Sequence, residues 1–143
     1  MHSRILHTAA IVAAVTAGFI AGRIVPVAEA SKAGRVFELR TYTAAPGKLD
    51  ALNARFRNHT VKLFEKHGMK NIGYWVPADE PKSRDTLIYI VAHDSREAAK
   101  KSWDAFRADP AWLKAREASE VEGKLTEKVE SVYMNPVDYS PMK

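Results

Sequence analysis

The chain has 143 residues and contains no cysteine. This absence excludes disulfide bonds, thiolate metal sites, a cysteine nucleophile and a lipoprotein anchor, because each of them needs a thiol. The five histidines never recur at i, i+2 or i, i+4 spacing, and no cluster of Asp and Glu supplies oxygen ligands. We therefore expect no metal site.

Sequence motifs of several large protein classes are also missing. The sequence has no phosphate-binding glycine loop, no dinucleotide fingerprint and no G-x-S-x-G nucleophile turn. These absences argue against kinase, Rossmann-type and hydrolase functions. The 22 Lys and Arg residues exceed the 17 Asp and Glu residues to give a net charge of +5, but the two signs are interspersed. Since phosphate binding needs a contiguous basic face, we expect no nucleic-acid partner.

The first thirty residues have the layout of a secretory signal peptide. Arg4 precedes an apolar run from Ile5 to Gly22, and Ala28 and Ala30 are the small residues that a cleavage site after Ala30 needs. Two interpretations stay open. The favoured one is export with removal of residues 1–30, which places the mature chain in the periplasm or outside the cell. The other is an uncleaved membrane anchor, because the apolar run is about the shortest that spans a bilayer.

The remainder is one domain's worth of chain, with a short tether over residues 31–35 and a folded domain over residues 36–143. Period-two alternation predicts a first strand over Val36–Thr43, followed by a turn at Pro46-Gly47. A helix is expected over Lys48–His67, and Gly68 then suits the left-handed position past its end. Its apolar stripe consists of Leu49, Leu52, Phe56, Thr60 and Leu63.

The second half repeats the strand and helix pattern. Strands are expected over Met69–Val76 and over Thr86–Ala92, the latter apolar on both faces. Asp94 and Glu97 resemble a capping box that begins a second helix. Pro110, next to Asp109, begins a third helix that ends at about Val121. A last strand covers Leu125–Met134, and a proline-containing tail follows over residues 135–143.

The order β-α-β-β-α-β predicts an α+β, ferredoxin-like split βαβ fold, one antiparallel sheet with its helices on one face. A strand that is apolar on both faces needs a second cover. The simplest cover is a second copy of the chain, which predicts a homodimer. We expect Glu38, Arg40 and Tyr42 to face this partner, with an ion pair between Glu38 and Arg40 fixing the register.

The sequence resembles the bacterial branch of the NIPSNAP family within the dimeric α–β barrel superfamily, over about Val36 to Pro141. The segments that carry the resemblance are Glu38–Tyr42, Pro46–Lys48, Phe56–Thr60, Gly73–Trp75, Ser95–Ala99, Trp103 to Trp112, Lys128–Val132 and Asp138–Pro141. The resemblance implies a dimeric barrel of sheets with a cleft between sheet and helices in each subunit. The better-known eukaryotic members are mitochondrial and linked to vesicle traffic and mitophagy, a role that does not transfer to an exported chain.

The superfamily contains cofactor-free monooxygenases, haem-degrading enzymes, lactone isomerases and members without known activity, so the fold does not identify a reaction. His59 is the candidate catalytic residue, because it lies beside the apolar stripe of its helix and is expected to face the sheet. It would act as a general base or ligate a haem iron. The alternative is a structural imidazole bonded to a neighbour. His67 suits a helix end, and His93 has no evident partner in the sequence.

Aromatic residues supply the other candidates. Tyr74 and Trp103 are expected to share the cleft with His59 and to bind an organic ligand, whereas the remaining aromatics fill the core. Two functions stay open. One is a homodimer that binds a small organic ligand in the sheet–helix cleft. The other is a small-molecule monooxygenase, cofactor-free or haem-linked, or an isomerase that uses His59. The sequence requires no cofactor, and haem is compatible with the second function.

Overall fold

The computed structural model describes residues 34–143. The expected signal peptide and residues 31–33 of the tether lie outside the described residues. The elements follow in the order β1 (Val36–Ala44), α1 (Leu49–Arg55), η1 (Phe56–Thr60), α2 (Val61–Lys66), β2 (Lys70–Trp75), η2 (Lys82–Arg84), β3 (Thr86–His93), α3 (Arg96–Ala108), α4 (Pro110–Ser119) and β4 (Thr126–Met134).

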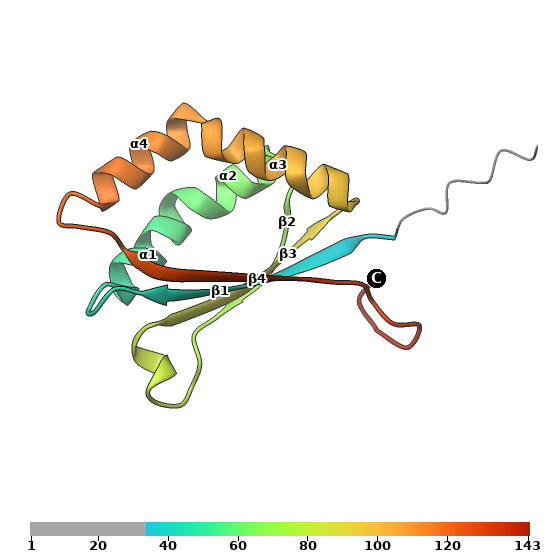
Figure 1. Cartoon of the computed structure of the whole chain (residues 1–143), viewed down its shortest axis with the longest axis horizontal. Helices are drawn as coiled ribbons and strands as arrows, with labels where there is room; N and C mark the ends of the chain where they lie inside the picture. The colour runs from blue at the N-terminus through green and yellow to red at the C-terminus, as the bar shows by residue number, and fades with distance from the viewer. Residues whose placement is uncertain (1–33) are drawn as a thin grey trace, which may run out of the picture. The chain divides into compact units, whose positions relative to one another are not determined.

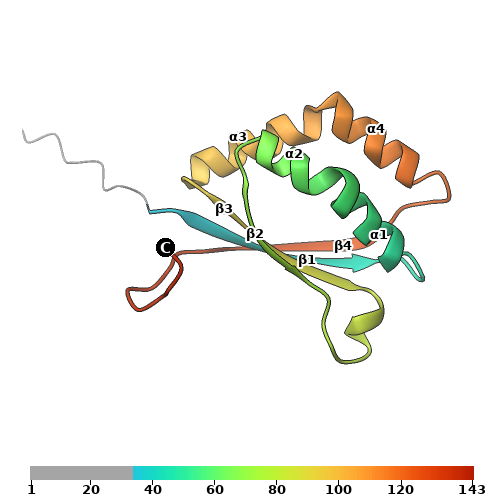
Figure 2. The ribbon, with the colours of Figure 1, turned by 180° about the vertical axis from the view of Figure 1, so that it is seen from behind.

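The four strands form one antiparallel sheet in the order β2-β3-β1-β4. The helices α1 to α4 cover one face of this sheet (Figure 1), and the view from behind shows the same arrangement (Figure 2). The predicted α+β, ferredoxin-like fold is therefore confirmed. Within residues 34–143, no helix is long and apolar enough to span a bilayer.

The first helical segment is not the continuous α-helix that the sequence predicts. A π-helical turn, η1, separates α1 from α2, and the Thr60 hydroxyl donates to the carbonyl of Arg55 at 3.4 Å. A π-turn accommodates one extra residue, so the residues beyond it shift around the helix axis. Phe64 is consequently buried, whereas Leu63 is only half-buried. Gly68 adopts φ 78° past the end of α2, as the sequence predicts.

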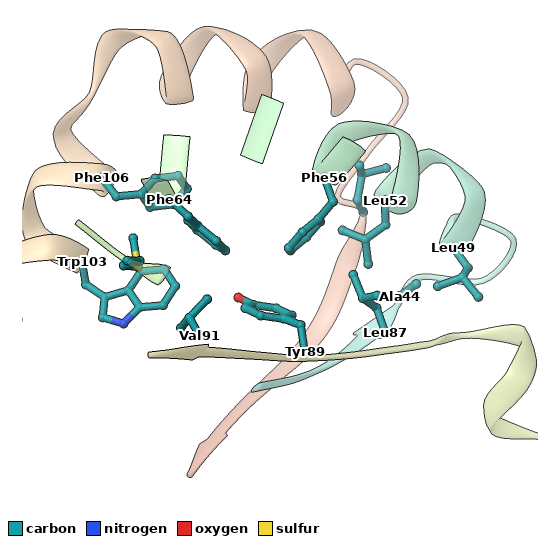
Figure 3. Packing of buried hydrophobic residues seen from close by; sticks show 12 residues of the cluster. Ala44, Leu49, Leu52, Phe56, Phe64, Leu87, Tyr89, Val91, Trp103 and Phe106 are labelled. Atoms are coloured by element: carbon teal, nitrogen blue, oxygen red, sulfur yellow. The ribbon is translucent and has the colours of Figure 1, made fainter. Parts of the chain in front are cut away.

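An aromatic cluster forms the core between the sheet and the helices. Figure 3 shows Phe56, Phe64 and Tyr89 converging there, with Trp103 and Phe106 beside them. The ring centroids of Phe56 and Tyr89 lie 5.2 Å apart, and those of Phe64 and Trp103 also lie 5.2 Å apart. Each such pair contributes about 0.5–1.5 kcal/mol beyond the burial of its area. The prediction that most aromatics fill the core is confirmed.

Polar caps fix where α3 and α4 begin. The Ser95 hydroxyl accepts a hydrogen bond from the backbone N–H of Ala98 at 3.0 Å, so Ser95 is the N-cap of α3. The capping box predicted from the sequence placed the side-chain acceptor one residue earlier, at Asp94. Asp109 caps α4 and accepts from the backbone N–H of Ala111 at 2.8 Å. Pro110 occupies the first helical position, as predicted.

Asp109 also joins α2 to α4. Its carboxylate lies 2.7 Å from both Lys66 Nζ and His67 Nε2. These hydrogen bonds, with that from the backbone N–H of Ala111, lower the pKa of Asp109 well below its usual range. His67 thus stands at the end of its helix, as predicted, and bonds to the cap of another helix.

The expected orientation of β1 is wrong. Glu38 and Tyr42 face the helices, since Glu38 bonds to Trp103 of α3 and the Tyr42 ring packs against Phe56 of η1. Arg40 lies on the same side, with its guanidinium over the Trp103 ring. Period-two alternation correctly groups Glu38, Arg40 and Tyr42, but it does not say which face of a sheet the helices cover. The face that carries these three residues is therefore not available to a second subunit.

The opposite face of the sheet, here called the outer face, is apolar over part of its area, and Lys128 and Glu130 form an ion pair on the same side of β4. By strand register it carries Leu39, Ile88, Ile90 and Val132, with Val132 55% exposed. The predicted doubly apolar character of β3 is confirmed, because Tyr89 and Val91 are buried on the helix side while Ile88 and Ile90 lie on the outer face. The tail covers one end of this face and encloses a cavity of about 260 Å³ with Phe37, Ile90, Met134, Asn135, Pro136, Val137, Ser140 and Met142.

Candidate functional site

A cleft of about 480 Å³, here called the α3 cleft, opens between α3 and the β1–β4 side of the sheet. Ligand pockets in proteins typically have volumes of about 300–1,000 Å³, so the cleft has room for a small molecule. It is lined by Glu38 and Arg40 of β1, Ser131 and Tyr133 of β4, and Arg96, Glu97, Lys100, Trp103 and Arg107 of α3.

The carboxylate of Glu38 is the centre of the cleft floor. Its Oε1 accepts from Arg40 at 2.7 Å and from the Ser131 hydroxyl at 2.6 Å. Its Oε2 accepts from the Trp103 indole N–H at 2.6 Å and lies 2.9 Å from His93 Nε2. With partners from β1, β3, α3 and β4, this one side chain ties three strands of the sheet to the helix above it.

These hydrogen bonds determine the charge of Glu38, which is only 1% exposed. Burial by itself would raise the pKa of the carboxyl group. The hydrogen bonds from His93, Ser131, Trp103 and Arg40 outweigh burial and lower the pKa of Glu38 from 4.5 to about 2. Glu38 is therefore a carboxylate at neutral pH, and its oxygens are already occupied by donors.

Arg40 extends the polar cluster into the aromatic core. Its guanidinium carbon lies 4.3 Å from the centroid of the Trp103 ring and 5.6 Å from that of Tyr42. The Tyr42 hydroxyl in turn accepts from the Tyr89 hydroxyl at 3.1 Å. Cation–π contacts and ion pairing together hold Arg40 in one orientation beside Glu38.

The α3 side of the cleft is basic. The guanidinium of Arg96 stacks on Tyr133, with its carbon 3.3 Å from the ring centroid. Burial, followed by the nearby Glu38 carboxylate, raises the pKa of the Tyr133 phenol. Lys100 and Arg107 both bond to Asp104, at 2.6 Å and 2.7 Å. Tyr133 remains protonated at neutral pH, so the cleft presents hydroxyl and guanidinium groups, while the indole N–H of Trp103 is donated to Glu38.

His59 does not lie in this cleft. It is exposed on η1 and lines a separate cavity of about 270 Å³ between the first helical segment and α4, together with Ala51, Ala54, Arg55, Asn58, Ala115, Ala118 and Ser119. The expectation that His59 faces the sheet is therefore wrong. The inward positions of the π-turn are taken by Phe56 and Thr60, both buried, which leaves His59 outside.

The cavity beside His59 also offers a poor fit to haem. Its volume of about 270 Å³ lies below the usual range for pockets that hold even drug-sized ligands, and haem is larger than these. Within residues 34–143, no group of three or more His, Asp or Glu side chains is placed to hold a metal ion. No step of a mechanism is therefore assigned to haem or to a metal.

Tyr74 and Trp103 are not neighbours in one pocket. Tyr74 stacks on Tyr89 with ring centroids 5.3 Å apart, and its hydroxyl donates to the side-chain oxygen of Asn71. Trp103 is buried and lines the α3 cleft. Of the three residues expected to form one site, the structure places only Trp103 at the sheet–helix cleft.

His93 and Glu38 are the site residues that the sequence did not reveal as partners. They are 55 positions apart, and no local spacing relates them. The one available signal was the run of polar side chains at alternate positions of the first strand, which the sequence alone assigned to a dimer interface. A carboxylate on an otherwise core-facing strand must find buried partners, and His93 and Trp103 are the ones it finds.

Comparison with known proteins agrees with this fold. The model of the NIPSNAP family matches residues 37–141. No protein with a curated description matches the chain. An uncharacterised NIPSNAP-like domain protein from Burkholderia xenovorans is 16% identical, with a TM-score of 0.66 over 76% of this chain and 90% of that one. A NIPSNAP family protein of unknown function from Agrobacterium tumefaciens is 22% identical, with a TM-score of 0.65 over 78% and 96%.

A third structure comes from a protein of known activity. SnoaB, a cofactor-independent oxygenase from Streptomyces nogalater, is 15% identical, with a TM-score of 0.52 over 76% of this chain and 99% of that one. At such low identity the likeness establishes the fold alone, which is the ferredoxin-like subunit of the dimeric α–β barrel type. It transfers no reaction to this chain.

Proposed function

The chain belongs to the NIPSNAP family, and on that premise we propose that it is an exported, homodimeric domain that binds a small organic ligand in the α3 cleft. The observation that carries the proposal is the cleft itself, about 480 Å³ in volume and walled by aromatic and hydrogen-bonding side chains. Trp103 contributes the small exposed part of its side chain to this wall, and its indole is fixed by the bond to Glu38 and by the Arg40 guanidinium over its ring. Fixed side chains bind a ligand at a lower entropy cost than mobile ones.

The polar cluster favours binding over catalysis. A general base needs a lone pair within reach of the substrate. Both oxygens of Glu38 already accept hydrogen bonds, and His93 is buried on the far side of Glu38 without lining the cleft. His93 has the orienting carboxylate that an active imidazole needs, but it lacks access to the cleft.

The enzyme hypothesis based on His59 receives less support. In the part of the chain that the structure describes, His59 makes no side-chain hydrogen bond and no ion pair with a carboxylate. An exposed imidazole without an orienting partner is a weak candidate base. A monooxygenase or isomerase that uses His59 therefore remains the second candidate.

Export and dimerisation complete the proposal. Export is supported by the apolar run Ile5–Gly22 and the small residues before Ser31. Dimerisation is supported by the apolar outer face, on which Leu39, Ile90 and Val132 lie side by side in the register of β3, β1 and β4. Large exposed apolar patches commonly mark contact surfaces between proteins.

The test is recovery of the ligand with the protein. We expect protein purified from its native host under gentle conditions to carry an organic molecule, detected by native mass spectrometry and absorbance. Trp103→Phe should lose this molecule, because a phenyl ring replaces the indole in the cleft wall and Glu38 loses the indole N–H as a donor. Trp112→Phe is the matched control, since Trp112 packs on Phe106 with centroids 4.5 Å apart and does not line the cleft.

The outcome at His59 separates the two candidate functions. If His59→Ala abolishes binding or turnover of the recovered molecule while Trp103→Phe leaves both unchanged, the α3 cleft is not the binding site. That result would support the enzyme hypothesis based on His59. If His59→Ala leaves ligand binding unchanged, the exposed imidazole has no part in the site.

A further inference from the structure

We propose that the ligand of the α3 cleft is a small organic carboxylate and that Arg96 holds its acidic group. This inference rests on the proposed function, because it names the class of molecule that the same cleft takes. It is carried by the charge distribution in the cleft and by the geometry of Arg96.

Positive charge predominates around the cleft. Four of the lining side chains are cations, Arg40, Arg96, Lys100 and Arg107, and two are carboxylates, Glu38 and Glu97. Arg40 is committed to Glu38, at 2.7 Å, and the Lys100 and Arg107 side chains converge on Asp104. Arg96 is left as the lining cation that, within residues 34–143, has no carboxylate partner.

Arg96 is also oriented for recognition. Its guanidinium lies over the Tyr133 ring, with 3.3 Å between its carbon and the ring centroid. The contact with the ring leaves the N–H donors of the guanidinium available to a ligand, because Arg96 donates no side-chain hydrogen bond within residues 34–143. A fixed edge of two parallel donors matches the two oxygens of a carboxylate, which is the geometry of the stronger, bidentate ion pairs.

The start of α3 adds to the positive potential. Arg96 is the first residue of this 13-residue helix, whose N-terminal end carries a partial positive charge. Ser95 caps the Ala98 N–H and the Glu97 carboxylate in the first turn offsets part of this field, so the Arg96 side chain supplies the direct contact.

The cleft floor suits the body of an organic acid rather than a second charge. Both oxygens of Glu38 are occupied, and its negative charge is opposed by Arg40 at 2.7 Å. Trp103 and Tyr133 border this floor with apolar ring atoms, while Arg40 lies over the Trp103 ring and Arg96 lies over the Tyr133 ring. The cleft thus pairs Arg96, which has no ion pair within residues 34–143, with apolar ring atoms, and this arrangement suits a small monocarboxylate even though the Glu97 carboxylate lies next to Arg96 in the sequence.

The experiment uses the full chain and two pairs of probes that differ only in charge. Benzoate is compared with benzamide, and hexanoate with hexanamide, by titration into ¹⁵N-labelled protein. The indole N–H resonance of Trp103 reports on the cleft. We expect saturable shifts from the two carboxylates and affinities at least about tenfold weaker for the two amides, since the charge-assisted pair with Arg96 is missing.

Three variants test the residue. Arg96→Gln should weaken carboxylate binding by about tenfold or more and remove the preference over the amide. Arg96→Lys keeps the positive charge but loses the planar guanidinium. Its affinity for the carboxylates should lie between those of the original chain and of Arg96→Gln. Arg57→Gln removes the same charge from an exposed position of η1 outside the cleft and should change nothing. Arg96 is exposed and Gln is a good helix former, so the fold is expected to persist.

The outcomes distinguish the two proposals. If carboxylates and amides bind equally and Arg96→Gln has no effect, the anion inference is overturned while the cleft stands as an organic-ligand site. If Arg57→Gln weakens carboxylate binding as much as Arg96→Gln, binding depends on the net charge of the protein and not on Arg96. The inference is then overturned as well. If none of the four probes shifts Trp103, the carboxylate inference is overturned, and if no organic molecule is recovered with the protein from its native host either, the organic-ligand proposal fails as well.

Discussion

At the scale of single residues, Glu38 determines how the sheet and α3 are held together. It is buried and charged, and four side chains from different elements donate to it. A buried charge is tolerated only when it is paired and hydrogen-bonded, so the loss of any donor exposes part of a large desolvation cost. The cluster is therefore as sensitive to mutation as an apolar core position.

The pH dependence of stability follows from this cluster. The pKa of Glu38 is about 2 in the folded chain, against 4.5 for the free group. A lowered folded pKa gives stability that is present above the unfolded pKa and is lost as the pH falls from about 4.5 to about 2. The contribution corresponds to about 3 kcal/mol at neutral pH. We expect Glu38→Gln to lose about this much and to show a flatter decline of stability below pH 4.5, measured by urea unfolding.

The control for this prediction is Glu117→Gln. Glu117 is exposed on α4, so its replacement should leave both the stability and the pH profile close to those of the original chain. A Glu38→Gln variant whose stability still declined as steeply as the original between pH 4.5 and 2 would show that Glu38 does not carry this dependence.

The residues of β1 that include Glu38 show what could and could not be predicted from the sequence. Alternation grouped Glu38, Arg40 and Tyr42 correctly, because side chains two apart on a strand share a face. It could not tell the helix side from the outer face, since both faces of the sheet are apolar and alternation is symmetric between them. The partnership of Glu38 with His93 and Trp103 is a product of the tertiary fold, which local spacing does not encode.

At the scale of elements, the sequence predicted the four strands and the helical segments α1–α2, α3 and α4, and it missed the short helix η2 and the π-turn. Glycine and proline signals located the turns and the helix ends well, as Gly68 and Pro110 show. The π-turn has no comparable marker, because its residues, Phe56–Thr60, continue an acceptable α-helical pattern. The position of His59 depended on this turn, which is why the candidate site was misplaced.

If η1 is a one-residue insertion, removing one exposed residue from it should restore a regular helix. Deletion of Asn58 would bring Phe56 and Phe64 seven positions apart, close to two full α-helical turns. We expect this variant to fold, with a free energy of unfolding within about 1 kcal/mol of the original chain, because Asn58 is exposed. Urea unfolding followed by circular dichroism measures the difference.

Deletion of Asn53 provides the contrast. Asn53 lies in the regular helix α1, so its loss rotates the preceding turn by about 100° and takes Leu49 and Leu52 off the core. Exposure of two core leucines should cost about 3–6 kcal/mol. Equal losses from the two deletions would mean that η1 is not an insertion in an otherwise regular helix.

At the scale of the whole molecule, export is the first proposal to test. Mass spectrometry of the protein from its native host should find Ser31 at the N-terminus, in the periplasmic or extracellular fraction. Ala28→Lys places a long charged side chain where the cleavage site needs a small one, so it should prevent removal of residues 1–30. An unmodified chain that keeps Met1 and resides in the membrane fraction would establish the anchor instead.

We expect the proposed dimer to form through the outer face rather than through the face first expected. The helices cover the side of Glu38 and Arg40 apart from the α3 cleft, whereas the outer side exposes Trp75 by 51% and Val132 by 55%. The tail covers only the end of this face near Phe37 and Met134. Water contact with this surface is unfavourable, and a symmetric pair of sheets would remove it from solvent in both copies.

We therefore expect the Ser31–Lys143 fragment to sediment as a dimer at micromolar concentration and Val132→Asp to sediment as a monomer. Val132 is already 55% exposed in a single subunit, so the substitution should dissociate the pair without unfolding it. Val121→Asp introduces the same charge at a position that is 82% exposed and lies beyond α4, so it should stay dimeric. The outer face is not the dimer interface if the original Ser31–Lys143 fragment sediments as a monomer. The same conclusion follows if Val121→Asp also dissociates the dimer.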